Sequence, residues 1–335
     1  MKKKIVLLLI CLLTISSLVG CSKKEEKINI GVSFGVGEAT RWQKEKTYME
    51  EKAAELGVNI EVRLNKTDTP LTQTEDCIEM IDQGIDVLIL TPRDVTNVEE
   101  IISYAKEKNV PVISYSRTVL NQYVDLVVGY DSYRLGQTMG QYLSESVYTG
   151  DYIILKGDPS DSNAQLTYDG AMRYIDPMRD DINIILEEAV PGWSRELAKE
   201  MVIEAIQNNG GNVDAILAPN DKIAGGCAEA VKELGIDHHV VITGMDAELD
   251  AIQRIINNEQ DMTISLDLQM LASTAIEEAV LLASGKKPKV NTEVSNGYNV
   301  PVPGYLITGI EIVKQNINSE IIEKGFYTTE EVYGN

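Results

Sequence analysis

The sequence predicts an α/β fold built from two domains with parallel-sheet cores. Short runs of Val, Ile and Leu alternate with longer helical segments along most of the chain, and such apolar runs are typical of strands covered on both faces. The alternation provides roughly ten strands, which is a large number for one sheet. The length of 335 residues is also about twice that of a usual single domain. We therefore expect two α/β domains of similar topology.

In the first half of the chain, β-branched runs alternate with helical segments that end at glycine. Gly57 and Gly84 follow two of the expected helices, and Thr91-Pro92 stops a buried strand. The expected strands are 28–34, 59–64, 87–90, 112–115 and 126–128, and the expected helices are 42–56, 71–83 and 95–108.

The same alternation resumes in the second half. The expected strands are 152–155, 182–186, 215–217, 240–242 and 262–266, and the expected helices are 164–174, 194–207, 222–234, 247–256 and 270–283. After residue 283 the pattern becomes irregular, with two prolines and a glycine between 301 and 304. We expect this tail to cross between the two domains.

Residues 1–20 have the layout of an export signal. Three lysines follow Met1, an apolar run extends from 5 to 18, and small or apolar residues lead into Cys21. The run is too short for a membrane span, so we interpret it as a signal peptide outside the fold. Its ending looks like a lipobox, which implies cleavage before Cys21 and a lipid on that sulfur; a plain signal peptide is the alternative. The charged stretch 21–27 is then a flexible tether outside the cytoplasm.

The acidic composition restricts the partners of the chain. The formal net charge is −22, and loss of the three lysines with the signal makes it more negative still. Such a surface repels nucleic-acid phosphates and anionic lipid headgroups. We therefore expect no nucleic-acid partner, and we expect membrane attachment to come from a lipid on Cys21.

Patterns typical of enzymes and metal sites are weak in this sequence. The two histidines, His238 and His239, are neighbours, and no nucleophile elbow or metal-ligand spacing accompanies them. Gly35-Val36-Gly37 follows the first strand but lacks the third glycine of a dinucleotide fingerprint. Cys77 and Cys227 lie far apart in helical segments, as structural thiols do. We expect no enzyme, cofactor or metal, although paired carboxylates for glycoside hydrolysis stay open.

Polar and aromatic side chains gather just past the ends of the expected strands. In open α/β sheets, ligands bind beyond the carboxyl ends of the strands. The candidate binding residues at these positions are Arg41, Trp42, Ser116, Arg117, Asn163, Trp193, Asn220 and Asp246.

This set of side chains fits a sugar. Planar Arg, Asn and Asp side chains can each engage two adjacent hydroxyls, and the C–H faces of a sugar ring pack against aromatic rings. The only tryptophans of the chain, Trp42 and Trp193, both belong to the set. The alternative for Asn220, Asp221 and Asp246 is that they cap the helices that follow them.

Several short segments at these positions carry a family resemblance. They are Arg41-Trp42-Gln43-Lys44, Asp158 to Ala164, Gly192-Trp193, Ala218-Pro219-Asn220-Asp221, Ala224-Gly225-Gly226 and 244–249. Through them the chain resembles the type 1 periplasmic (extracytoplasmic) sugar-binding proteins, in particular those that bind D-xylose for bacterial ABC importers. The resemblance covers the chain from about residue 27 to residue 327.

The resemblance implies two Rossmann-like lobes joined by a three-segment hinge, with the sugar in the cleft. It implies an N-terminal lobe of 28–132 plus 268–306 and a C-terminal lobe of 133–267 plus 307–335. The pentose would lie among Arg41, Arg117, Asn163, Trp193, Asn220 and Asp246, with Trp42 as a wall of the site.

Two positions depart from the family pattern. Ser116 stands where the xylose binders usually have Asp, and Leu266 stands where they usually have Lys. Loss of each charged partner could cost on the order of 1.5–3 kcal/mol of binding energy. The resemblance implies a membrane partner, an ABC importer, that receives D-xylose or another pentose. The alternative partner is a membrane histidine kinase to which the lipoprotein reports its sugar.

Overall fold

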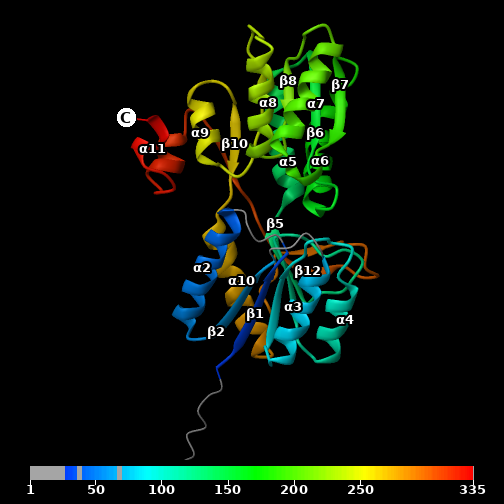
Figure 1. Ribbon diagram of the computed structural model, residues 1–335, viewed down its shortest axis with the longest axis vertical. Coiled ribbons are helices and arrows are strands. Elements are labelled where there is room, and N and C mark those ends of the chain that lie inside the picture. Colours follow the sequence, from blue (N-terminus) through cyan, green and yellow to red (C-terminus); the bar gives the residue numbers. More distant parts are fainter. Residues whose placement is uncertain (1–26, 36–39, 66–69, 335) are drawn as a thin grey trace, which may run out of the picture.

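Two α/β lobes form the molecule, as predicted (Figure 1). The structure is a computed structural model that describes residues 27–35, 40–65 and 70–334. The predicted signal peptide, most of the predicted tether and the predicted lipid anchor at Cys21 lie outside these residues. We call the lobe that contains β1 the first lobe, and the other the second lobe.

The first lobe has a seven-stranded sheet in the order β11-β12-β5-β4-β3-β1-β2. All neighbouring strands are parallel except β11 and β12. Its strands are β1 (Asn29–Phe34), β2 (Asn59–Leu64), β3 (Val87–Thr91), β4 (Val112–Tyr115), β5 (Leu126–Tyr130), β11 (Thr292–Val294) and β12 (Val302–Ile307). Its helices are α2 (Thr40–Leu56), α3 (Pro70–Asp82), α4 (Glu99–Glu107) and α10 (Leu268–Ala283). Residues of α2 and α10 pack on one face of this sheet, and residues of α3 and α4 pack on the other.

The second lobe has a parallel sheet in the order β7-β6-β8-β9, beside the antiparallel pair β10 and β13. Asp261 joins the two parts, because its backbone N–H donates to Ile242 O over 3.0 Å. The strands are β6 (Gly150–Lys156), β7 (Ile182–Ala189), β8 (Ala215–Leu217), β9 (Val241–Ile242), β10 (Met262–Ser265) and β13 (Ile310–Val313). The helices are α5 (Ser132–Ser146), α6 (Ser162–Ile175), α7 (Arg195–Asn208), α8 (Asp221–Glu233), α9 (Leu249–Ile256) and α11 (Thr329–Tyr333).

The chain passes between the sheets at three places. These are Asp131 between β5 and α5, residues 266–267 between β10 and α10, and residues 308–309 between β12 and β13. The irregular tail therefore contributes β12 to the first lobe and β13 to the second. The predicted lobe boundaries, 28–132 plus 268–306 and 133–267 plus 307–335, stay a prediction of which residues move together.

The sequence pattern reveals neither helix α5 nor the elements after residue 283, which are β11, β12, β13 and α11. Gly136 and Gly140 lower the helix propensity of α5. The structure gives the reason for both glycines: a Cβ at Gly136 would lie 1.9 Å from Thr167 O, and one at Gly140 would lie 2.2 Å from Ala171 O. The glycines allow α5 to pack closely against α6, so tertiary contact outweighs local propensity here.

The two cysteines within the described ranges are free and buried, as expected. Cys77 packs among α3, α4 and the first sheet, and Cys227 packs in the second lobe. Among residues 27–35, 40–65 and 70–334, no helix is both long enough and apolar enough to cross a membrane.

Candidate functional site

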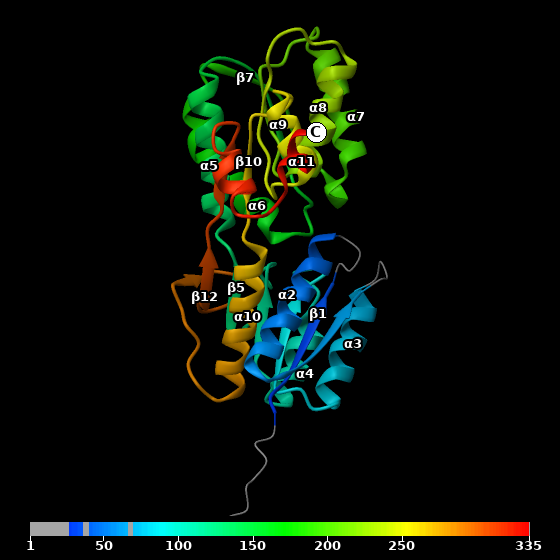
Figure 2. The same ribbon diagram turned by 90° about the vertical axis from the view of Figure 1, so that its left-hand side faces the viewer.

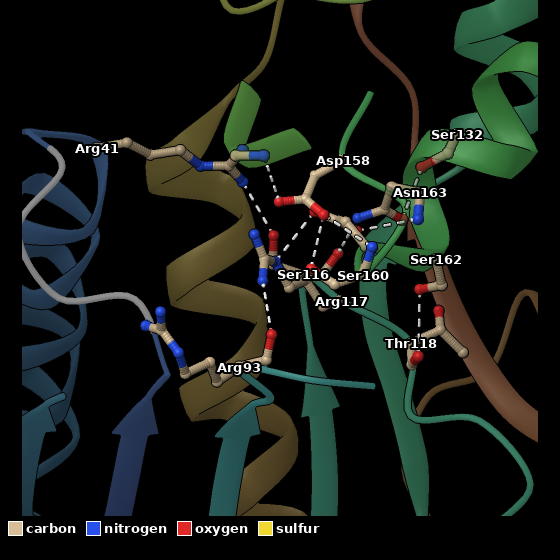
Figure 3. A network of polar contacts seen from close by, with 12 residues as sticks. Arg41, Arg93, Ser116, Arg117, Thr118, Ser132, Asp158, Ser160, Ser162 and Asn163 are labelled. Atoms are coloured by element: carbon tan, nitrogen blue, oxygen red, sulfur yellow. Dashed lines mark hydrogen bonds and ion pairs between the residues drawn. The ribbon is translucent and has the colours of Figure 1, made fainter. Parts of the chain in front are cut away.

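Four of the candidate residues lie where the two lobes face each other: Arg41, Ser116, Arg117 and Asn163 (Figure 3). Figure 3 shows Arg41, Ser116 and Arg117 of the first lobe directed toward Asp158 and Asn163 of the second. Arg41 lies in α2, which follows β1, and Ser116 and Arg117 follow β4. Asp158 lies in the turn after β6, and Asn163 lies in the first turn of α6. These positions are at the sheet edge at which α/β proteins bind ligands.

Arg41, in the first turn of α2, is the best-connected cation of the site. Its Nε lies 2.6 Å from Glu45 Oε1, and its Nη2 donates to Ser116 Oγ over 3.0 Å. Its Nη1 lies 3.9 Å from Asp246 Oδ1 in the opposite lobe. Burial opposes the charged form, but the carboxylates of Glu45 and Asp246 outweigh it and raise the pKa of Arg41. Arg41 is therefore a fixed positive charge that faces both lobes.

Trp42 supports Arg41 from within the core of the first lobe. The indole is buried and lies 5.4 Å from the ring of Phe34, at an interplanar angle of 42°. The Arg41 guanidinium lies 4.8 Å from the Trp42 ring centroid and 5.8 Å from that of Tyr130. Such cation–π contacts hold the guanidinium in place. The Trp42 ring thus packs against the Arg41 guanidinium from the core side.

Ser116 and Asn163 join the lobes directly. Ser116 follows the last residue of β4 and has φ at 63°, in the left-handed region, which turns its carbonyl toward the second lobe. Asn163 Nδ2 donates to this carbonyl over 2.8 Å, and Asn163 Oδ1 accepts from Ser132 Oγ over 2.9 Å. Both ends of the Asn163 amide are therefore oriented by the protein.

Arg117 lies in an ion pair that sequence reasoning did not assign to the site. Its Nε is 3.0 Å from Asp161 Oδ2, and both side chains are largely buried. Arg117 Nη1 also donates to Arg93 O over 3.2 Å. Asp161 caps α6, because its Oδ1 accepts from the backbone N–H of Asn163. Its place two residues before Asn163, past the end of β6, is the signal that could have identified it.

Asp246 stands on a strained loop at the start of α9. Its φ is 105° and that of Ala247 is 51°. The buried carboxylate of Asp221 fixes the loop, since Asp221 Oδ2 accepts from Glu248 N over 2.9 Å and from Thr263 Oγ1 over 2.8 Å. Burial raises the pKa of Asp246 to about 7, although Arg41 opposes the shift. Asp221 therefore positions Asp246 and does not itself face the other lobe.

Trp193 and Asn220 come from two other strand ends of the second lobe. A Cβ at Gly157 would lie 2.1 Å from Trp193 Cη2, so the indole packs flat against that glycine. Asn220 Oδ1 accepts from Ile223 N over 3.0 Å and caps α8, as the alternative interpretation predicts. The cap uses only the oxygen, which leaves the amide group of Asn220 able to donate. Within the described residues, no hydrogen bond joins Trp193 or Asn220 to Arg41.

The two lobes thus present complementary chemistry across one interface. Arg41 and Arg117 of the first lobe face Asp246 and Asp161 of the second. No group of three or more His, Cys, Asp or Glu side chains that could hold a metal occurs in the described part of the chain. The arrangement can donate to and accept from several hydroxyls of one small polar ligand.

Fold and site together define an extracytoplasmic solute-binding protein. The family model "Periplasmic binding protein domain" matches residues 30–287, and the chain belongs to this family. It is 34% identical to the D-xylose-binding periplasmic protein of Haemophilus influenzae, over 99% of both chains. It is 32% identical to the D-xylose-binding periplasmic protein of Escherichia coli, over 99% of this chain and 100% of that one.

A solved structure gives the same assignment of fold. It is an ABC transporter solute-binding protein from Clostridium phytofermentans with bound β-D-glucose. Its TM-score is 0.84 at 26% identity, with 91% of this chain and 99% of that chain covered. The predicted family resemblance and fold class are confirmed. These relatives are binding proteins, so the prediction that the chain is not an enzyme is also confirmed.

Proposed function

We propose that this chain is a lipid-anchored extracytoplasmic receptor for D-xylose or a close pentose. The observation that carries the proposal is the convergence of Arg41, Asn163 and Asp246 from two lobes on one interface. The names of the two relatives with 34% and 32% identity support the choice of sugar.

Binding and closure follow from the same geometry. A sugar held between the lobes contacts both of them only when they are close together, so it stabilises the closed arrangement. Ser116 Oγ accepts from Arg41 at the position where the family usually has Asp. A neutral hydroxyl there still orients the guanidinium, which leaves its remaining N–H groups for sugar oxygens.

Calorimetry of the full chain against pentoses and hexoses tests the proposal. We expect D-xylose or a near epimer to bind most tightly. Asp246→Asn should weaken that binding, and Asp237→Asn, at a fully exposed aspartate on the same lobe, should leave it unchanged. Absence of binding to every monosaccharide would overturn the proposal.

We propose an ABC importer as the membrane partner and Cys21 as the lipid attachment site. Cys21→Ser should release the protein from the membrane fraction without changing its sugar affinity. The partner is tested by co-purification in the presence of sugar. A stoichiometric complex with the extracellular domain of a histidine kinase, in place of a permease, would assign the chain to sugar sensing.

A further inference from the structure

A cavity lies between the lobes beside Asp246. It has a volume of about 380 Å³, and small-ligand pockets commonly have about 300–1,000 Å³. Lys44 and Tyr48 of α2 and Gln269 of α10 line it from the first lobe, while Phe326 and Tyr327 line it from the second. Figure 2 shows α2 and α10 side by side below the C-terminal segment of the second lobe.

The cavity adjoins the candidate pentose site through Asp246. This residue lines the cavity, and its Oδ1 is also 3.9 Å from Arg41 Nη1. Leu266, in the segment 266–267 that joins the two lobes, also lines the cavity. Its side chain has no polar group that could pair with Asp246. A ligand held by Arg41 and Asp246 could therefore extend past Leu266 into the cavity.

The lining of the cavity has the chemistry that carbohydrates require. Phe326 is 45% exposed and lines the cavity, so its ring is accessible to a ligand there. Lys44 Nζ lies 6.0 Å from the ring centroid of Tyr327, so a cation and an aromatic face from opposite lobes meet there. Aromatic faces cover the C–H faces of a sugar, and the Lys44 and Gln269 heads can bind its hydroxyls.

We propose that this cavity binds the second unit of a pentose disaccharide whose first unit lies in the pentose site. The inference rests on the proposed function and extends it from a monosaccharide to a short xylose oligomer. Because both lobes line the cavity, the second unit would also stabilise the closed arrangement.

Calorimetry of the full chain with D-xylose and with xylobiose tests this inference. We expect xylobiose to bind, and Phe326→Ala to weaken xylobiose at least about tenfold while changing D-xylose less than about twofold. Tyr148→Ala, at an exposed aromatic residue elsewhere on the second lobe, is the matched control and should change neither affinity. Leu266→Lys should place a cation beside Asp246, block the passage and lower the ratio of xylobiose to xylose affinity.

Each outcome bears on the inference in a defined way. If D-xylose binds while xylobiose does not, the cavity is not a sugar subsite and the pentose site stands. If xylobiose binds equally well to the wild type, Phe326→Ala and Leu266→Lys, the second unit lies elsewhere and the inference is wrong. If neither sugar binds, this inference is wrong, and the panel of monosaccharides then decides whether the proposed function stands with another pentose.

Discussion

The two lobes hold their halves of the site by different means. In the first lobe, Arg41 is fixed by an ion pair to the buried Glu45 and by the core residue Trp42. In the second lobe, Trp193 and Asp246 stand on turns with φ of 53° and 105°. Backbone strain of this kind persists only where surrounding contacts enforce it.

The charges of the two halves also differ in sign. The first lobe presents arginines, and the second presents carboxylates and an amide. This complementarity favours approach of the lobes. It also places charged groups where they can form hydrogen bonds to the hydroxyls of a sugar. The first half of the site is part of its lobe's core, whereas the second half depends on local turns. Stability and binding should therefore respond differently to substitutions in the two halves.

The largest effect is expected on the free energy of unfolding, from a substitution in the first lobe. Arg41→Ala leaves Glu45 buried without its cation, and should lower the free energy of unfolding by about 3 kcal/mol. Chemical denaturation measures this change. Adding Glu45→Gln to Arg41→Ala should recover more than half of the loss, because it replaces the buried, unpaired carboxylate of Glu45 with a neutral amide.

Arg173→Ala, at an exposed arginine of α6, is the control and should stay within about 0.5 kcal/mol of the wild type. An equally small effect of Arg41→Ala would show that the ion pair is not part of the core.

The next effect is on binding, from the second lobe. Asp246→Ala and Trp193→Ala should each weaken pentose binding at least about tenfold, or roughly 1.4 kcal/mol, since each removes a side chain that we propose to contact the sugar. Asp237→Ala is the matched control. Calorimetry with D-xylose measures all three, and wild-type affinity in both site variants would place the site elsewhere.

The strand positions followed from the sequence because buried parallel strands are continuous apolar runs. Strands 59–64, 112–115 and 215–217 begin and end where the pattern predicts. Helix α4 begins at Glu99 and not at residue 95, because residues 95–98 form a turn before it. The sequence pattern predicts no helix where α5 lies, because the glycines of α5 lower its helix propensity and serve close contact with α6.

The site was predictable to the extent that strand ends converge. That rule gathers Arg41, Ser116 and Asp246, which the structure brings into contact or near contact. It places Asp161 past the end of β6 but does not reveal its partner Arg117. It also does not reveal Glu45, because a polar residue inside a helix carries no sequence mark of its contacts across the fold. Those contacts depend on how α2 and the two lobes pack.

A smaller effect is expected on the pH dependence of stability. The pKa of Asp246 is raised to about 7 in the folded protein, so the folded state retains a proton that the unfolded state has lost. This group therefore stabilises the fold at low pH, and its contribution is lost as pH rises toward 7. Relative to Asp246→Asn, the wild type should lose on the order of 1 kcal/mol more between pH 5 and pH 8.

Denaturation at the two pH values measures the difference between wild type and variant. Burial raises the pKa values of Asp221 and Glu248 as well, and the charge of Asp246 adds to the shift of Asp221, so the difference reports Asp246 together with its coupling to Asp221. Parallel pH profiles for the two proteins would contradict the assignment.

The smallest effect tests how far the second half of the site depends on one turn. Gly157→Ala would place a Cβ 2.1 Å from Trp193 Cη2, so the indole must move and pentose affinity should fall about threefold. Gly129→Ala is the matched control in the first lobe, because its Cβ would lie 3.8 Å from the nearest atoms, in ordinary contact. Calorimetry separates the two variants. An unchanged affinity in Gly157→Ala would mean that the sugar tolerates displacement of Trp193, and that the second lobe binds mainly through Asn163 and Asp246.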